Sequence, residues 1–380
     1  MNKKLLIALS VAAAAMAPLG ATRAATVVYG KINLSVDAWD TQTSTTTKPF
    51  PIKFRGAKVN QGHNIDLDSN QTAVGVKGSE ALGGGLKAIY QLEWQLDPTV
   101  AGGSSAKVGG DIGNGGGAKD VWKGRDMWIG LQSPGMGTVR FGTVTTSYKQ
   151  TGKMVDPLWR TSLQARNLGM ESPLQKGAGE DGQGRANRTI RYDSPSMMGA
   201  KLIGTYTMHS NTKYANDDPY SLALVYHQGP ILGFASYITN NHGGNDSAWK
   251  IGGKFSYAGA ALYGQFEKDN GLITRSFGGY NGYHQSTAKA GGANTWFLGA
   301  SYKVGRAMLI AEYGQGNASD VNTVKSVGSN NDETAYLVAA KYAFSRRTYM
   351  YGGWARVAAN NESIGFKHQD LLTIGMAHSF

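Results

Sequence analysis

The sequence predicts an all-β protein, a barrel of 16 antiparallel strands that crosses a membrane. Three observations carry this prediction. Residues 28–38 alternate between apolar and polar side chains over about eleven residues, the length that a tilted strand needs to cross a bilayer. Strand-like segments then recur in pairs, joined by short connections that carry Gly or Pro. The composition, with 53 Gly, 19 Tyr and 8 Trp but only 17% charged residues, suits tight turns and interfacial aromatic side chains.

The first and last predicted strands have the same two-faced pattern. Val28, Ile32 and Val36 share one face of the first strand. Leu372 and Phe380 share one face of the last, which is mostly apolar. The last strand alone could equally be the edge of a soluble sandwich. The length of the first strand favours a barrel, since strands in globular proteins are usually about five or six residues long.

Seven predicted hairpins lie between these two strands and bring the count to 16. Longer polar segments, such as residues 40–64, 99–123 and 270–294, separate the hairpins, so that short and long connections alternate. Outer-membrane barrels distribute their turns and loops in this way. The paired segments are 71–79 with 86–93, 125–132 with 138–144, 187–193 with 201–209, 220–227 with 232–239, 249–257 with 261–268, 295–304 with 307–314, and 335–344 with 348–357.

The N-terminal residues predict export. Residues 1–4 are basic, residues 5–17 form an apolar run, and small residues follow as far as Ala24. This pattern is typical of a secretory signal peptide, here residues 1–24, which leaves residues 25–380 as a single barrel domain. Cysteine is absent, so disulfides do not stabilise the fold. The net charge of +12 comes from scattered basic residues with no run of five, which argues against a nucleic-acid partner.

Motifs for catalysis or cofactor binding are missing from the sequence. The seven His residues lack metal-ligand spacing, and no Gly-x-Ser-x-Gly elbow occurs. The glycine runs at 83–85 and 115–117 precede no predicted helix, so they are poor phosphate-binding loops. We therefore expect neither an enzyme, nor a cofactor, nor a bound metal.

Several segments, in their order and spacing, resemble the trimeric porins of Gram-negative bacteria, in particular those of the beta-proteobacterial type. The resemblance implies a 16-stranded barrel, a homotrimer and a third external loop folded into the pore. It also implies that the strand ending in Phe380 is the signal that the barrel assembly machinery reads before insertion among outer-membrane lipids. The matching segments are 28–30, 75–80, 82–88, 130–131, 187–195 with Gly199, 345–348 and 375–380.

The third long connection, residues 145–184, is the longest in the chain and is the candidate constriction. Loops of this length are uncommon unless they are functional or disordered. It could lie on the surface, or it could fold inward, with Leu158 and Trp159 packed against the barrel wall. Its charged side chains are Lys149, Lys153, Asp156, Arg160, Arg166, Glu171, Lys176, Glu180 and Asp181.

Strand parity assigns further charges to the lumen, because lipid-facing positions disfavour them. Arg125 shares the parity of Met127 and Ile129, which would aim it at lipid unless a bulge intervenes, although the family commonly has a pore-facing arginine there. The parity-assigned acids are Asp37, Glu93 and Glu312, and the bases are Lys31, Lys77, Lys87, Arg140, Arg191, Lys303, Lys341 and Arg356. The candidate pore-lining residues are Lys31, Lys77, Lys87, Arg125, Arg140, Lys149, Lys153, Asp156, Arg160, Arg166 and Arg191.

This excess of basic residues predicts a pore for small hydrophilic solutes and ions that modestly prefers anions. Two departures from the family pattern argue against strong selectivity: Ala73 stands where an arginine is frequent, and Gly142-Thr143 replaces a Gly-Arg pair. Two alternatives stay open. One is a surface adhesin that uses loop residues such as 276–283, and the other is a channel specific for small organic anions.

Overall fold

The computed structural model describes residues 25–43, 53–54, 57–58, 62–99, 122–171, 178–179, 184–208, 218–239, 247–269, 294–317, 333–359 and 366–380. The expected signal peptide, residues 1–24, and the loop segment 276–283 lie outside these ranges. Within them, helices are too short or too polar to cross a membrane.

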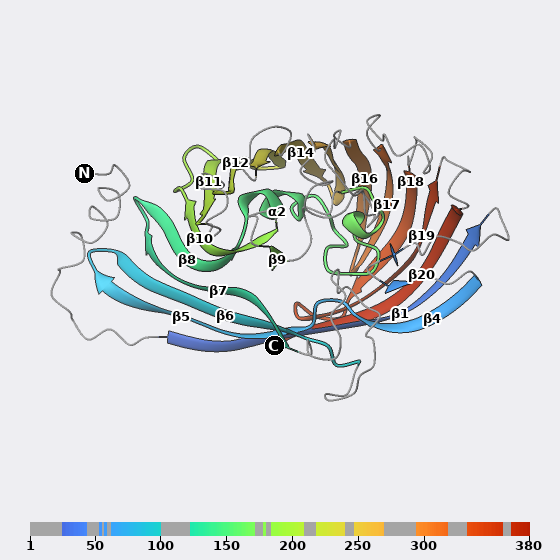
Figure 1. Cartoon of the computed structure of the whole chain (residues 1–380), viewed down its shortest axis with the longest axis horizontal. Helices are drawn as coiled ribbons and strands as arrows, with labels where there is room; N and C mark the ends of the chain where they lie inside the picture. Colours follow the sequence, from blue (N-terminus) through green and yellow to red (C-terminus); the bar gives the residue numbers. More distant parts are fainter. Residues whose placement is uncertain are drawn as a thin grey trace.

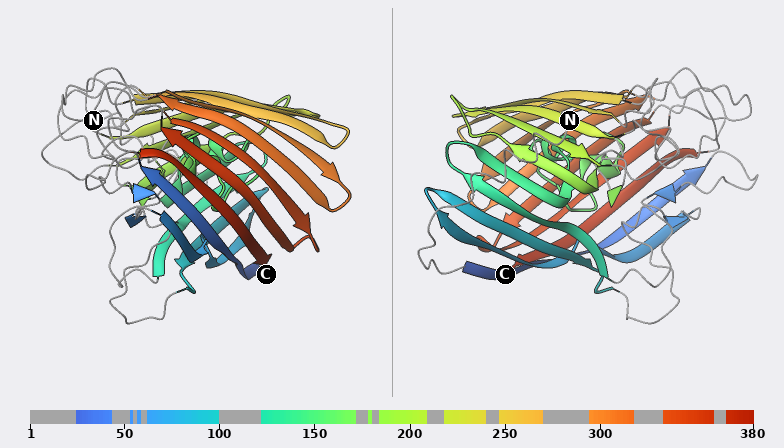
Figure 2. Two further views of the ribbon diagram at one scale, coloured as in Figure 1. Left: turned by 90° about the vertical axis from the view of Figure 1, so that its right-hand side faces the viewer. Right: turned by 60° about the vertical axis from the view of Figure 1, so that its left-hand side comes forward.

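The strands form one closed antiparallel barrel (Figure 1), which confirms the predicted fold. Each of the 16 long strands pairs with its neighbour around the ring, and the views in Figure 2 show them inclined side by side. The predicted hairpins are all present. The long strands are β1 (Ala25–Thr43), β5 (Ala73–Gly83), β6 (Leu86–Leu96), β7 (Trp122–Ser133), β8 (Gly137–Thr145), β10 (Arg185–Asp193), β11 (Ala200–Thr207), β12 (Tyr220–Gln228), β13 (Ile231–Thr239), β14 (Ser247–Tyr257), β15 (Ala260–Asp269), β16 (Asn294–Val304), β17 (Ala307–Asn317), β18 (Glu333–Ala343), β19 (Thr348–Ala359) and β20 (Phe366–Ser379).

The ring closes between β1 and β20. Lys31 lies opposite Ser379, and the pairing continues to Thr43 opposite Phe366. The other edge of β1 pairs with β5. Closure leaves no open sheet edge between the first and last strands, so the sandwich alternative for the last strand is excluded.

A short strand that the sequence did not predict extends β5. Strand β4 (Gly62–Ser69) pairs with β1 next to β5, so β4 and β5 together fill one position in the ring. Gln71, with φ 62°, lies in the break between them. The polar composition of residues 62–69 hides this strand, because only Ile65 and Leu67 are apolar. Three further short elements are β2 (Lys53–Phe54), β3 (Ala57–Lys58) and β9 (Ala178–Gly179).

The two faces of the barrel differ as parity predicts. Apolar side chains such as Leu222, Ile251 and Leu298 are exposed on the outer face. Polar side chains such as Asn33 and Thr205 are buried on the inner face. The short turns, for example Gly84–Gly85 with φ of 57° and 82°, all lie at one end of the barrel, which we call the short-turn end.

Candidate pore constriction

The third long connection runs inside the barrel, which excludes a surface location for its described part, residues 146–171. Thr146 opens helix α2 (Ser147–Gly152), and its hydroxyl accepts a hydrogen bond from the backbone N of Lys149 at 3.2 Å. The backbone N and the hydroxyl of Thr146 both donate to the carbonyl of Gly184, each at 2.9 Å, which holds the two ends of the connection together. Figure 1 shows α2 within the ring of strands. A second helical turn, η1 (Ala165–Asn167), follows.

One side of this loop packs on the barrel wall through apolar side chains. Leu158 and Leu163 are fully buried and belong to one cluster with Phe234, Phe297 and Leu337 of the wall. Burying each leucine contributes about 1.5–3 kcal/mol, so these contacts fix the loop strongly. The expectation for Leu158 is thus confirmed.

Trp159 differs from the expectation. Its side chain is only partly buried, and the Arg166 guanidinium carbon lies 4.4 Å from the centre of its ring. Trp159 therefore covers a cation on the loop instead of anchoring the loop to the wall.

The opposite side of the loop is held to the wall by polar contacts. The Ser162 hydroxyl donates to the Asp37 carboxylate and lies 3.0 Å from the Ser35 hydroxyl. The Asn33 side-chain amide donates to the Arg160 carbonyl. Lys341 Nζ donates to the Pro157 carbonyl at 2.9 Å. The loop therefore has fixed partners on both sides, and the lumen beside it is narrowed.

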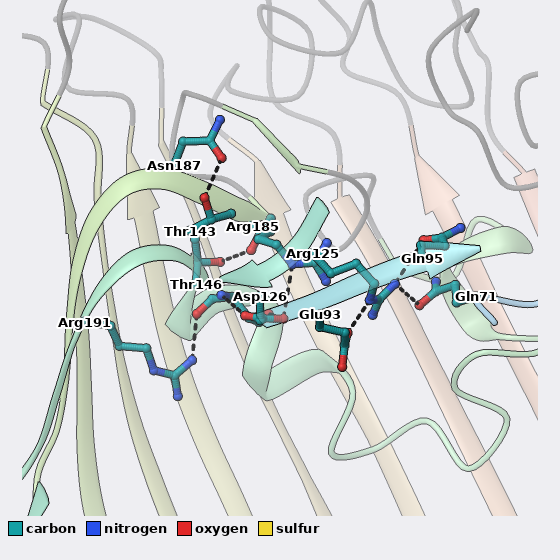
Figure 3. A network of polar contacts seen from close by, with 12 residues as sticks. Gln71, Glu93, Gln95, Arg125, Asp126, Thr143, Thr146, Arg185, Asn187 and Arg191 are labelled. Atoms are coloured by element: carbon teal, nitrogen blue, oxygen red, sulfur yellow. Dashed lines mark hydrogen bonds and ion pairs between the residues drawn. The ribbon is translucent and has the colours of Figure 1, made fainter. Parts of the chain in front are cut away.

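A network of arginines and carboxylates faces the loop (Figure 3). Arg125 forms an ion pair with Glu93 and donates to Gln95 Oε1 at 3.0 Å. Arg185 Nε lies 3.2 Å from Asp126 Oδ2. Charge-assisted hydrogen bonds of this kind are short and directional, so each pair holds its side chains in place.

A second group of charged residues extends the network toward the short-turn end. Arg191 donates twice to the Asp193 carboxylate, at 2.8 and 2.9 Å, and once to the Thr145 carbonyl at 2.7 Å. Arg140 and Lys201 share the same carboxylate. Asp193 is thus matched by three basic side chains.

Arg125 lies on the lumen side of the barrel, so the simple parity argument that aimed it at lipid is wrong. The β6–β7 register shifts between Leu92 and Trp94, where Leu92 faces Met127 and Trp94 faces Gly124. The extra residue on β7 turns Arg125 inward, where it is 3% exposed. A bulge cannot be located from strand periodicity alone.

Of the charged loop residues named from the sequence, Lys176, Glu180 and Asp181 lie outside the described residues, and the others separate into two groups. Lys153 is exposed to the lumen and Arg160 is half-buried at its edge, and neither forms an ion pair within the described residues. Arg160 has φ 64°, an uncommon conformation for a residue other than glycine. Burial and the nearby Arg125 guanidinium lower the pKa of Arg160 to about 10, which leaves it charged at neutral pH.

The other loop residues are buried. Lys149, Arg166 and Asp156 are 6%, 3% and 5% exposed. Burial lowers the pKa of Lys149 well below its usual value, and the neighbouring Arg185 adds to this effect. The Asp156 carboxylate accepts backbone hydrogen bonds from Leu158 at 2.8 Å and Ala165 at 3.2 Å, so it organises the loop.

The remaining named residues lie nearer the short-turn end. Lys31 Nζ donates to the Tyr349 hydroxyl at 2.8 Å, Lys77 Nζ lies 4.9 Å from the centre of the Tyr29 ring, and Lys87 is exposed. They do not join the arginine network.

Sequence reasoning missed two members of the network, Asp126 and Arg185, and a buried cluster behind the loop. In that cluster, the Tyr148 hydroxyl donates to Glu267 at 2.6 Å, and Lys250 Nζ lies 4.3 Å from the centre of the Tyr148 ring. Asp126 follows directly on Arg125, and Arg185 lies two residues before the predicted strand 187–193, but the two side chains meet only because β8 pairs with both β7 and β10.

Residues 5–362 match the model of the Gram-negative porin family. The chain is 25% identical over 394 residues to the major outer membrane protein P.IB of Neisseria lactamica, with 100% of both chains covered. It is 27% identical over 384 residues to a P.IB protein of Neisseria gonorrhoeae, covering 95% of this chain and 96% of the relative.

Among solved structures, the anion-selective porin from Comamonas acidovorans has a similar fold, with a TM-score of 0.65 and 17% identity over 94% of this chain and 100% of that one. A trimer form of OmpT from Vibrio cholerae has a TM-score of 0.59 and 13% identity, covering 94% of this chain and 99% of that one.

Proposed function

Because the chain belongs to the Gram-negative porin family, we propose that it is a passive, water-filled pore with a modest preference for anions. It lies in the outer membrane, where its relatives are major outer membrane proteins. Small hydrophilic solutes and ions diffuse through the lumen beside the loop. No catalytic step is involved, since members of this family are channels.

The imbalance of charge at the constriction carries the anion preference. Glu93 and Asp126 are each bound to an arginine, so their negative charges are matched. Arg160 and Lys153 reach the same space without a carboxylate partner within the described residues. Fixed charge of one sign raises the local concentration of counter-ions. The anion-selective porin from Comamonas acidovorans supports this direction by its similar fold alone.

Reversal potentials in a KCl gradient test this proposal. Wild-type protein in a planar bilayer should pass chloride in preference to potassium. Removing one charge about 8 Å from the ion path changes the energy of a passing ion by about 0.5 kcal/mol in water, and by roughly half of that at about 0.1 M salt, with opposite signs for chloride and potassium. Replacing Arg160 and Lys153 by Ala should therefore lower the chloride-to-potassium permeability ratio by roughly twofold per charge.

Arg346→Ala is the matched control, because it removes an equal charge from an exposed turn. Folded protein that does not conduct would overturn the pore itself. A reversal potential that the Arg160 and Lys153 changes leave unaltered would overturn the role of these two residues. Saturable block of the current by a small organic anion would instead indicate the substrate-specific alternative.

We also propose that the protein assembles as a homotrimer, as the trimer form of OmpT does. In this proposal, residues 1–24 are removed after export, the assembly machinery recognises the strand that ends in Phe380, and the outer face of the barrel contacts outer-membrane lipid. Mass spectrometry of the membrane-inserted protein tests the cleavage site, and its native mass tests the trimer.

A further inference from the structure

Charge is distributed unevenly along the barrel axis. Four lysines line the inner wall in its short-turn half and have no carboxylate partner within the described residues: Lys77 on β5, Lys87 on β6, Lys254 on β14 and Lys303 on β16. We call them the vestibule lysines. Strands β5 and β6 are neighbours, and β14 and β16 lie on the other side of the ring with β15 between them, so the four charges flank the short-turn opening of the lumen on two sides.

Strand parity places these side chains on the inner face. Lys254 shares the face of buried Lys250, whereas Ile251 and Phe255 are 51% and 52% exposed on the outer face. Lys303 shares the face of buried Phe297, and Val304 is 56% exposed on the outer face. Both lysines lie close to a short turn: Lys254 is four residues before Ala258–Gly259, and Lys303 is two residues before Gly305–Arg306.

Other cations at this level are held in place by oxygen atoms. Lys31 donates to the Tyr349 hydroxyl, and Lys341 donates to the Pro157 carbonyl; both acceptors are neutral, so these two lysines add to the positive charge of this half. Arg140, Arg191 and Lys201 share the Asp193 carboxylate.

Carboxylates are scarce in this half of the barrel. Apart from Asp193, the described residues place Glu80 next to the turn after β5, and Glu312 at the middle of β17, where its carboxylate accepts a hydrogen bond from the Tyr263 hydroxyl. Glu80 lies opposite Ala88, and the next pair along the strands is Ala81 opposite Lys87. Because neighbouring residues of a strand point to opposite faces and Lys87 faces the lumen, Glu80 belongs to the outer face. Among the described residues, the vestibule lysines therefore outnumber the acidic side chains of this half and form no ion pair with them.

The other half of the lumen contains both signs of charge. Glu93 binds Arg125, and Asp370 binds Arg356. Glu267 accepts from Tyr148 in the cluster that includes Lys250. Opposite charges at close range largely cancel at a distance, so this half contributes a weaker field than the short-turn half.

We propose that the vestibule lysines make the pore electrically asymmetric, drawing small anions into the lumen from the short-turn, periplasmic side. This inference rests on the proposed pore function and names a second set of residues that determine its selectivity. Uncompensated charge acts over about 10 Å at 0.1 M salt and about 30 Å at 0.01 M salt. Anion preference should therefore be stronger when the dilute solution bathes the short-turn side.

The test measures reversal potential with about 0.01 M and 0.1 M KCl on the two sides, in both gradient directions. Channels are inserted from one side of the bilayer. The chamber that the short-turn end faces is identified with the variant Arg346→Cys, which reacts with a membrane-impermeant thiol reagent added to that chamber. We expect the chloride-to-potassium permeability ratio to be about twofold or more higher when the short-turn side is dilute. In the triple variant Lys87→Gln, Lys254→Gln, Lys303→Gln the difference between the two directions should fall, because Lys77 is the one vestibule lysine that keeps its charge.

The matched control is the triple variant Lys123→Gln, Lys268→Gln, Lys367→Gln, which removes the same charge from the long-loop end and should keep the asymmetry. Equal ratios in both directions for the wild type, or an asymmetry in the vestibule variant as large as that of the wild type, would overturn the inference. If one of these results is found while the pore still prefers chloride, the proposed function stands. If the folded wild-type protein does not conduct at all, the proposed function is wrong. If the vestibule variant does not fold, the two-direction measurement on the wild type still decides.

Discussion

The aromatic ring of Phe380 lies directly against the α-carbon of Gly30, where the first and last strands close the barrel. The two residues exchange backbone hydrogen bonds, Gly30 N to Phe380 O and Phe380 N to Gly30 O, both at 3.0 Å. A β-carbon at Gly30 would lie 2.3 Å from Phe380 Cζ. A side chain at position 30 therefore has to displace the ring.

Gly30→Val should impair barrel closure for this reason. The valine forces the Phe380 ring away from β1, so its effect should resemble that of Phe380→Ala. The ring is 49% exposed, so we expect each change to cost less than the roughly 3 kcal/mol typical of a fully buried Phe. The yield of folded, membrane-inserted protein measures the effect, while the conductance of the channels that do form should stay unchanged.

Gly233→Ala provides the control, because a β-carbon there meets no atom within 4 Å. Normal insertion of the Gly30→Val protein would show that the ring contact has no part in closure.

The position of the constriction loop can be tested with a disulfide, since the chain has no cysteine. The hydroxyls of Ser35 on β1 and Ser162 on the loop lie 3.0 Å apart. The double variant Ser35→Cys, Ser162→Cys should therefore form an intramolecular disulfide with little change in conductance, because the loop is already docked there. Mobility on non-reducing gels and single-channel current are the two measurements.

The single variants Ser35→Cys and Ser162→Cys control for effects of the thiols themselves. Free thiols in the folded double variant under oxidising conditions would place the loop elsewhere.

Glu93→Gln should strengthen anion preference. Glu93 is 7% exposed and forms an ion pair with Arg125, so neutralising the Glu93 carboxylate leaves the positive charge of that guanidinium uncompensated beside the ion path. At about 8 Å and about 0.1 M salt, one unit charge shifts the energies of chloride and potassium in opposite directions by about 0.25 kcal/mol each, which corresponds to roughly a twofold rise in the chloride-to-potassium permeability ratio. The double variant Glu93→Gln, Arg125→Gln should return close to the wild-type ratio. A fall in the ratio for Glu93→Gln alone would contradict this charge balance.

Much of the barrel could be predicted from the sequence, because the alternation of apolar and polar residues that marks each long strand lies within that strand. Alternation along residues 28–38 sets the faces of β1 without reference to its neighbours. Strand β4 and the inward turn of Arg125 could not be predicted in this way. Both depend on how two strands align, and a single register shift near Leu92 reverses the face of the residues beyond it.

The candidate constriction was predictable as a segment but not as a site. Its length and charges distinguish residues 145–184, yet the sequence gives no sign that Arg160 reaches the lumen while Lys149 is buried. That division follows from which side chains pack on the wall, and it depends on residues as distant as Phe234 and Leu337.

Docking of the constriction loop should weaken as pH rises. The Glu171 side chain is 1% exposed, and neither carboxylate oxygen has a hydrogen-bond partner among the residues that the structure describes. Burial raises its pKa from 4.5 to about 8; among its charged neighbours, Lys250 and Arg166 oppose this shift, whereas Asp156 and Glu267 add to it. Burial likewise raises the pKa of Asp156 from 3.8 to about 6.

Both shifts have the same sign. A carboxyl whose pKa is higher in the docked loop favours docking while it is protonated, so its contribution is complete below its ordinary pKa and is lost as pH rises through the raised value. Asp156 should lose its contribution between about pH 4 and 6, and Glu171 between about pH 4.5 and 8. Open-channel current noise and hydrogen exchange at residues 146–171 should therefore increase over this range.

Glu171→Gln separates the two groups, because an uncharged amide of similar shape cannot ionise. In that variant the rise above about pH 6 should disappear, while the rise between about pH 4 and 6 that belongs to Asp156 should remain. Glu80→Gln, at an exposed position near a turn, controls for loss of a carboxylate elsewhere. Noise and exchange that increase equally in Glu171→Gln would exclude Glu171 as the titrating group, because the docked loop would then respond to pH above about 6 without the carboxyl whose pKa burial raises to about 8.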